Sequence, residues 1–225
     1  IFYKISNTYF NNLIFSQISL RNGLLSALNS VNDSSVKARI SDITGELAGF
    51  ILPPEECQDI LQHTYGSILS ANPVDREIGV GLLGMLSNNL ISLFCEASNI
   101  NTILDIFTKN LVDTSNRGRL SLSAIRSFST LIANVPQESD WDTFHCLIDS
   151  IFTGYINAVN FVQSGSIDLE VACSYTDALI EIATDGSGFF ASRLLDIFKI
   201  TMNVLESPAT HSTIRHLTLE LLVTI

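Results

Sequence analysis

The amino-acid sequence predicts an all-α protein built as a stack of helix pairs, and three observations lead to this fold class. Apolar residues recur at helical spacing along most of the chain, and no segment shows the sustained alternation of a β-strand. All five prolines fall between the segments that have helical spacing. The composition is 46% hydrophobic and only 16% charged, which requires a large buried core and excludes a disordered chain.

Residues 36–52 illustrate the pattern that the rest of the chain repeats in weaker form. The large apolar side chains of this segment share one stripe of a helix: Val36, Ile40, Ile43, Leu47 and Phe50 or Ile51. Arg39, Asp42 and Glu46 recur at the same period on the opposite side. Burial of each large apolar side chain is worth about 1.5–3 kcal/mol, so we expect the stripe to pack against a neighbouring helix.

The same reasoning divides the chain into ten helices joined by short turns. They are expected at residues 18–31, 36–52, 55–71, 75–94, 98–112, 118–134, 139–160, 168–184, 189–206 and 213–225. Residues 1–16 are interpreted as the end of an earlier helix. Asp75 is the expected N-cap of the helix that follows the Asn72-Pro73 turn. For residues 219–225 a strand remains an alternative, because their spacing also fits a strand.

An early basic residue marks the second helix of several pairs and gives the repeat length. Lys37, Arg76 and Arg119 are separated by 39 and 43 residues, and Arg119 lies 96 residues, or two repeats, before Arg215. Two-helix repeats of about 40–47 residues are typical of HEAT and armadillo arrays, whereas tetratricopeptide and ankyrin repeats are shorter. We therefore expect a single array over residues 1–225. It comprises the end of a truncated repeat at 1–16 and repeats at 17–52, 53–95, 96–135, 136–185 and 186–225.

The ends of the chain lead to a separate expectation. The sequence has no initiator methionine and stops within an apolar helical pattern, so we interpret it as a piece of a longer protein. Repeat arrays are stabilised by their neighbouring interfaces. Ile1–Phe10 and Leu217–Ile225 are therefore expected to fray or to make contacts between molecules.

Within this fold class the sequence resembles the importin-β superfamily of nuclear transport receptors, and most closely the Ran-binding-protein-five type of karyopherin. Residues 36–51 and Arg215–Ile225 are similar to inner helices of such receptors. Phe2–Phe10, Asp75–Leu86 and Arg119–Asn134 fit the same series in the same order. The resemblance implies a right-handed α-α superhelix of HEAT repeats from the N-terminal half of a receptor. In such a superhelix, outer A helices cover inner B helices that line a concave surface. The fourth repeat departs from the pattern, since it lacks the early basic residue.

The resemblance also implies a function in binding and not in catalysis. Receptors of this family bind Ran in its GTP form through N-terminal repeats, hold cargo on the concave wall and meet Phe-Gly nucleoporins through outer helices. Ran and cargo oppose one another, which releases cargo in the nucleus. We therefore expect a role in import through the nuclear pore, shuttling between cytoplasm and nucleus, and no cofactor. The alternative is a HEAT-repeat scaffold subunit of a phosphatase or another multiprotein complex.

Charge and spacing indicate where partners would bind. The net charge of −11 and the pI near 4.6 oppose direct binding of nucleic acid and favour basic partners, although many soluble proteins are simply acidic. The candidate protein-binding residues of the concave face are Arg39, Asp42, Glu46, Arg119, Ser123, Arg126, Glu170, Asp177 and Glu181. The acidic members are expected to suit Lys- and Arg-rich cargo, and the arginines to divide the acidic field into patches. A solvated helix face with i, i+4 pairs would give the same spacing.

Two motifs raise an enzymatic or metal-binding alternative. Residues 79–84 match G-x-G-x-x-G, but the dinucleotide fingerprint needs a preceding strand, and here the glycines fall within an expected helix. His145, Cys146 and Asp149 are close in sequence, yet the other histidines and cysteines fall on separate helices without ligand spacing. We therefore expect neither a nucleotide nor a metal. The uncharged run 78–95 has the length of a membrane span, but asparagines and serines interrupt it, so a packed helix is expected.

Overall fold

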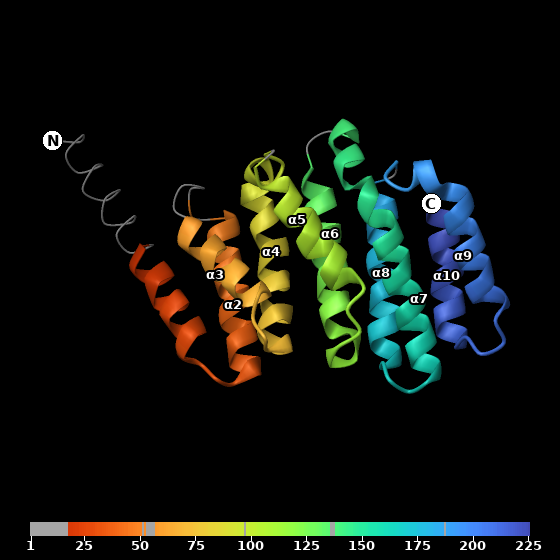
Figure 1. The fold of residues 1–225 in the computed structure, drawn as a ribbon, viewed down its shortest axis with the longest axis horizontal. Helices are drawn as coiled ribbons and strands as arrows, with labels where there is room; N and C mark the ends of the chain where they lie inside the picture. Colours follow the sequence, from red (N-terminus) through yellow and green to blue (C-terminus); the bar gives the residue numbers. More distant parts are fainter. Residues whose placement is uncertain (1–17, 51, 53–56, 97, 136–137, 187) are drawn as a thin grey trace.

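The structure is a computed structural model, and it describes residues 18–225 apart from 51, 53–56, 97, 136–137 and 187. Our expectations for residues 1–16, for the prolines at 53–54 and for Pro136 therefore lie outside the described residues. Helices lie side by side in a row along the long axis of the molecule (Figure 1). Chain order follows this row from one end to the other, as expected for a stack of helix pairs.

Helices make up most of the described chain. The α-helices are residues 18–30, α2 (Ser34–Phe50), α3 (Gln58–Ile68), α4 (Pro73–Phe94), α5 (Ile100–Leu111), α6 (Arg119–Asn134), α7 (Ile148–Gln163), α8 (Leu169–Asp185), α9 (Leu194–Glu206) and α10 (Ser212–Thr224). The 3₁₀ segments are η2 (Asn116–Gly118), η3 (Glu138–Leu147) and η4 (Ala191–Arg193). No strand occurs among the described residues, so the predicted all-α fold class is confirmed. The strand alternative for residues 219–225 is wrong, because α10 covers all but the last of them.

The helices are arranged in two layers. The B helices α2, α4, α6, α8 and α10 pack against one another in chain order, and the A helices α3, α5, α7 and α9 each pack against the B helix that follows (Figure 1). One hydrophobic core extends between the layers, from Leu47 in α2 to Leu221 in α10. An interior B helix is covered by a B helix on each side and by an A helix on a third side, so only its fourth side is exposed. These exposed faces together form the surface that we call the B-helix face.

The buried side of α2 differs from the predicted stripe. Val36 and Ile43 are 48% and 53% exposed. The buried residues of this helix are Ser41, Thr44, Gly45, Leu47 and Ala48. A Cβ atom at Gly45 would overlap the side chain of Met85 in α4. Because α4 lies so close, small side chains fill most of the α2–α4 contact, and the predicted burial of Val36 and Ile43 is wrong.

The glycines at 79, 81 and 84 lie inside α4, and those at 79 and 84 allow neighbouring helices to approach closely. A Cβ atom at Gly79 would lie 2.8 Å from the backbone nitrogen of Ile68 in α3, and one at Gly84 would lie 2.7 Å from the Cα of Ser127 in α6. The strand and tight turn of a dinucleotide site do not precede these glycines. By length and composition α4 could also cross a membrane, and half of its most apolar window is buried. Its contacts with α2, α3 and α6 account for that apolar character.

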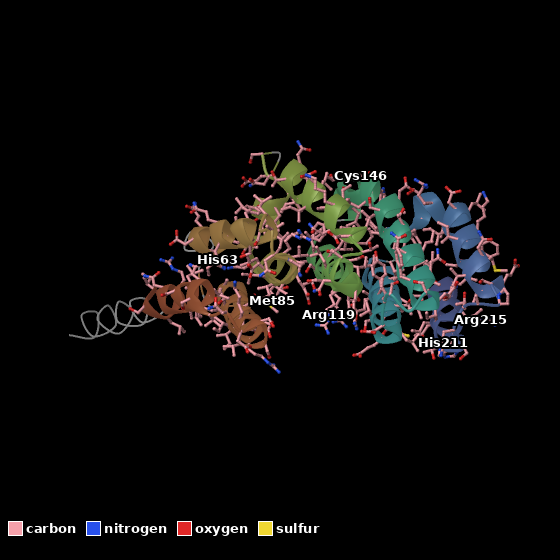
Figure 2. All side chains as sticks on the ribbon, turned by 60° about the horizontal axis from the view of Figure 1, so that its bottom comes forward. His63, Met85, Arg119, Cys146, His211 and Arg215 are labelled. Atoms are coloured by element: carbon pink, nitrogen blue, oxygen red, sulfur yellow. The ribbon has the colours of Figure 1, made fainter. Side chains whose placement is uncertain are left out.

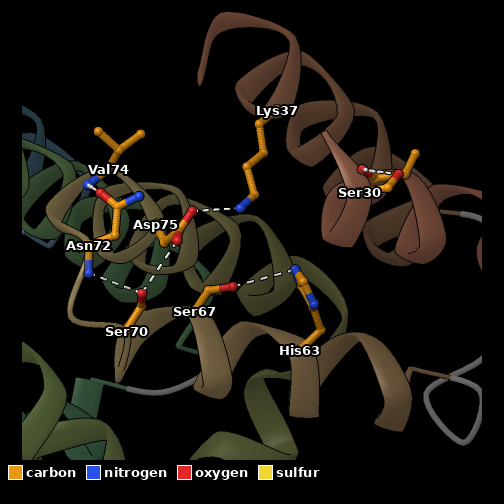
Figure 3. A network of polar contacts seen from close by, with 9 residues as sticks. Ser30, Lys37, His63, Ser67, Ser70, Asn72, Val74 and Asp75 are labelled. Atoms are coloured by element: carbon orange, nitrogen blue, oxygen red, sulfur yellow. Dashed lines mark hydrogen bonds and ion pairs between the residues drawn. The ribbon is translucent and has the colours of Figure 1, made fainter. Parts of the chain in front are cut away.

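Asn72, and not the predicted Asp75, caps α4. The Asn72 side chain accepts a hydrogen bond from the backbone N–H of Val74 at 3.0 Å. Asp75 joins α4 to α2 instead, since Lys37 Nζ donates to Asp75 Oδ1 at 2.6 Å and Ser70 donates to its other oxygen at 3.3 Å (Figure 3). The hydrogen bond from Lys37, with the lysine charge, lowers the pKa of the Asp75 carboxyl. The cap prediction failed because a partner 38 residues away holds Asp75.

The helix expected over residues 139–160 is divided into two parts. Glu138–Leu147 forms a 3₁₀ helix, and the α-helix begins at Ile148. Trp141, Phe144 and Leu147 are buried at a spacing of three residues. Three residues is the period of a 3₁₀ helix, so this geometry turns all three side chains toward the core.

Candidate functional site

The predicted protein-binding residues all lie on B helices. Arg39, Asp42 and Glu46 are on α2, Arg119, Ser123 and Arg126 on α6, and Glu170, Asp177 and Glu181 on α8. All are exposed except Ser123, which is half-buried. Figure 2 shows Arg119 of α6 and Met85 of α4 on the same side of the molecule, with Cys146 of η3 on the opposite side. The predicted residues therefore belong to the exposed layer that the B helices provide.

A groove of about 460 Å³ lies on the B-helix face between α4, α6 and α8. Its lining residues are Glu77, Gly81, Gly84, Met85, Arg119, Leu122, Ser123, Arg126, Ser127, Thr130, Asp168, Glu170, Val171 and Ser174. The groove thus brings together the three predicted residues of α6 and Glu170 of α8. Asp42 lines an adjoining hollow of about 170 Å³ between α2 and α4. Asp177 and Glu181 line neither of these two hollows.

Hydroxyl side chains of α6 fix the wall between α4 and α6. Ser123 Oγ donates to the carbonyl oxygen of Glu77 at 3.0 Å, and Ser127 Oγ donates to the carbonyl oxygen of Val80 at 2.7 Å. Gly84 leaves room for this approach, since a side chain there would meet Ser127. These two hydrogen bonds join α6 to backbone carbonyl oxygens of α4. They hold the two helices close together along the wall of the groove.

Burial and neighbouring charge shift two carboxyl groups at the edges of the groove. Burial raises the pKa of Glu77, while the Arg119 charge and a hydrogen bond from Asn116 Nδ2 at 2.8 Å oppose that rise. Burial also raises the pKa of Asp177, and the negative charge of Glu220 adds to it, while Arg126 lowers it. Each arginine of α6 therefore acts on a carboxyl group of a different neighbouring helix. The electrostatic order across the face is acidic α4, basic α6 and acidic α8.

The structure adds acidic residues that the sequence reasoning did not select. Glu77 and Asp168 line the groove, and Glu220 of α10 faces Asp177 closely enough to act on its pKa. The spacing of Glu77, Gly81 and Gly84 gives the same i, i+4, i+7 face as the chosen sets. Two of the three positions on this face are glycines, so it lacks the row of charged residues that marks the other sets.

The sequence cluster around His145 is divided among different partners. His145 lies 3.3 Å from Asp142, and Cys146 Sγ donates to the Thr143 carbonyl oxygen at 3.5 Å. Asp149 pairs instead with Arg193 at 2.7 Å. Within the described part of the chain, no group of three His, Cys, Asp or Glu side chains is placed to hold a metal ion. The groove itself is lined by charged and hydroxyl side chains, which can form ion pairs and hydrogen bonds.

Solved structures of the karyopherin Kap121p share this fold. The Kap121p structure has 25% sequence identity and a TM-score of 0.74 over 91% of this chain. Kap121p bound to the extreme C-terminus of the protein phosphatase Cdc14p also has 25% identity and a TM-score of 0.74, and Kap121p bound to the SUMO protease Ulp1p has 24% and 0.75. The matches span 18% or 19% of the Kap121p chains, so the chain corresponds to less than a fifth of their length.

These structures confirm the predicted HEAT-repeat α-solenoid and support the importin-β superfamily. No family model and no curated protein matches the sequence.

Proposed function

We propose that the chain is a segment of a nuclear transport receptor of the importin-β superfamily, of the Ran-binding-protein-five type. The observation that carries the proposal is the structural likeness of 91% of the chain to karyopherins, among them chains bound to other proteins. The sequence resemblance of the B helices supports the same family independently. The work of such a segment is binding, and its receptor shuttles between cytoplasm and nucleus.

In this proposal the B-helix face is the concave wall that holds cargo. The groove between α4, α6 and α8 and its acidic margins support this role. A protein of net charge −11 attracts basic segments, and exposed carboxylates steer their association. Ran in its GTP form would compete with cargo for the receptor, and Phe-Gly nucleoporins would meet the A helices on the opposite side.

The two nucleotide states of Ran test the receptor function directly. The immobilised full-length protein should retain Ran loaded with GTP and should not retain Ran loaded with GDP. Ran-GTP should also release a bound basic cargo. A HEAT-repeat scaffold of another complex would retain neither form of Ran, and that result would contradict the proposal.

Charge reversal on α8 tests whether the B-helix face holds cargo. Replacement of Glu170, Asp177 and Glu181 by Lys should weaken a basic cargo by about fivefold or more, because exposed ion pairs are worth about 0.2–1 kcal/mol each. Circular dichroism should remain unchanged, since all three side chains are exposed. The matched control reverses three exposed acids outside the B helices: Asp105, Asp142 and Glu206. Equal weakening by both triple variants would indicate a general charge effect and no cargo site on α8.

A further inference from the structure

The sign of charge changes twice across the part of the B-helix face formed by α4, α6 and α8. Glu77 is the acidic residue of α4 at the groove, and α6 contributes Arg119 and Arg126. Beyond α6 the face is acidic again: Asp168, Glu170, Asp177 and Glu181 at α8, and Glu220 on α10. A chain laid across these helices therefore meets negative, positive and negative potential in turn.

The positive band on α6 is continuous along the helix. Arg119, Ser123, Arg126 and Thr130 follow one another at spacings of four, three and four residues, and all four line the groove. None of them is acidic. Both arginines are exposed, and in the part of the chain that the structure describes neither forms an ion pair. Their guanidinium groups are therefore available to a carboxylate, which arginine binds in a two-pronged geometry.

The spacing of helices sets the spacing that a bound chain would need. Packed helices lie about 8–10 Å apart, and a polyproline II segment has three residues per turn and advances about 3.1 Å per residue. A polyproline II segment that crosses the B helices therefore turns every third side chain toward them, after an advance of about 9 Å. A side chain over α6 is then flanked, three residues before and after it, by side chains over α4 and α8.

We propose that the segment bound on this face carries an acidic residue over α6, with a basic residue about three positions away on each side. This inference rests on the proposed cargo-binding function and specifies the partner further. A lysine over α6 would face Arg119 and Arg126 and would be repelled. A glutamate over α6 pairs with the arginines, while the flanking lysines pair with Glu77 and with Glu170 or Asp177.

Peptide binding to the full-length protein tests the charge order. The first labelled peptide has two lysines, each three residues from a central glutamate, and in the second a lysine replaces that glutamate. A third peptide keeps the composition of the first but carries the glutamate outside the pair of lysines. Fluorescence anisotropy at about 0.15 M salt should give the first peptide about fivefold tighter binding than either of the others. The difference should shrink at about 1 M salt, where the screening length falls from about 8 Å to about 3 Å.

Reversal of the arginines identifies the place of recognition. Arg119→Glu with Arg126→Glu should invert the order, so that the peptide with three lysines binds tightest. The matched control, Lys109→Glu with Lys199→Glu, reverses two exposed charges on the A helices and should leave the order unchanged.

The possible failures are distinguishable. If the three-lysine peptide binds unmodified protein at least as tightly as the first, while the α8 triple reversal still weakens both, the charge order is wrong and the cargo function stands. An order that survives the arginine reversal also overturns this inference, because the acidic residue is then recognised elsewhere. If neither the peptides nor an intact basic cargo binds, the proposed function fails together with it.

Discussion

Replacement of Gly84 by Ala tests the close approach of α4 and α6, on which the groove depends. The new Cβ would lie 2.7 Å from both the Cα and the Cβ of Ser127. Rotation of the serine side chain cannot relieve a contact with its Cα, so the two helices must move apart. Gly81 provides the matched control one turn earlier in α4, because a Cβ there would meet only Ser123 Oγ, at an ordinary 3.4 Å.

Two opposing effects decide the size of the change. Alanine in a helix interior is favoured over glycine by about 1 kcal/mol, and both positions gain this amount. Overpacking a close contact costs about 1–3 kcal/mol, and only Gly84→Ala incurs that cost. Gly81→Ala should therefore stabilise the protein by up to about 1 kcal/mol, while Gly84→Ala should leave it unchanged or destabilise it by up to about 2 kcal/mol.

Urea denaturation followed by circular dichroism measures the difference between the two variants. We expect the free energies of unfolding to differ by about 1–3 kcal/mol, with the lower value for Gly84→Ala. Gly66→Ala in α3 has nothing within 4 Å of the new Cβ and should behave like Gly81→Ala. If Gly84→Ala proves as stable as these two controls, the two helices do not approach as the structure describes.

Three further predictions concern polar contacts within the array. Lys37→Met should cost about 1 kcal/mol at neutral pH. Lys37 lowers the pKa of Asp75 below 3.8, so the pair contributes to the free energy of unfolding above that pH, and this contribution is lost as the pH falls through the folded pKa. The free energy of unfolding of the variant should therefore fall less steeply with acidification than that of the unmodified protein. Burial raises the pKa of Tyr155 from 10.0 to about 12 despite its hydrogen bond with Thr218, so the free energy of unfolding should fall as the pH rises from 10 to about 12. Tyr155→Phe should reduce this fall, and a spectrophotometric titration of the variant should lack a phenol that ionises near pH 12. Asn89→Ala removes two hydrogen bonds to carbonyl oxygens of Ala48 and Leu52 at 2.8 Å, and urea denaturation should show a loss of about 1–3 kcal/mol, whereas an unchanged midpoint would contradict a role for Asn89 in holding the end of α2.

The order of the helices could be predicted because the signals for it are local. Helical spacing and turn residues act within a few positions, and proline ends a helix through its own geometry. The buried side of α2 could not be predicted in the same way. We assigned burial by side-chain size, but Gly45 lets Met85 approach, and the contact selects small residues. The N-cap of α4 was missed for a related reason, since Lys37 holds Asp75 from a distant part of the sequence.

The candidate site was predictable as a set of helix faces and not as a groove. Spacing along α6 correctly placed Arg119, Ser123 and Arg126 on one side of that helix. Which faces meet across the groove depends on how the helices rotate in the layer, and spacing within one helix does not contain that information. Glu77 joins the site for this reason, whereas Glu181 on α8 lies outside the groove and accepts a hydrogen bond from Ser129 at 3.3 Å.

The packing of each B helix against the B helices before and after it bears on how the protein folds. The contacts between consecutive B helices join segments about forty to fifty residues apart, such as 46 for Ser123 and Glu77 and 52 for Ser129 and Glu181, so each step of assembly closes one loop of moderate length. Such a chain is expected to fold rapidly, to begin at whichever helix pair forms first and to extend from there in both directions. A destabilising substitution in one pair should therefore open that pair and its neighbours first, while distant pairs keep their protection against amide hydrogen exchange.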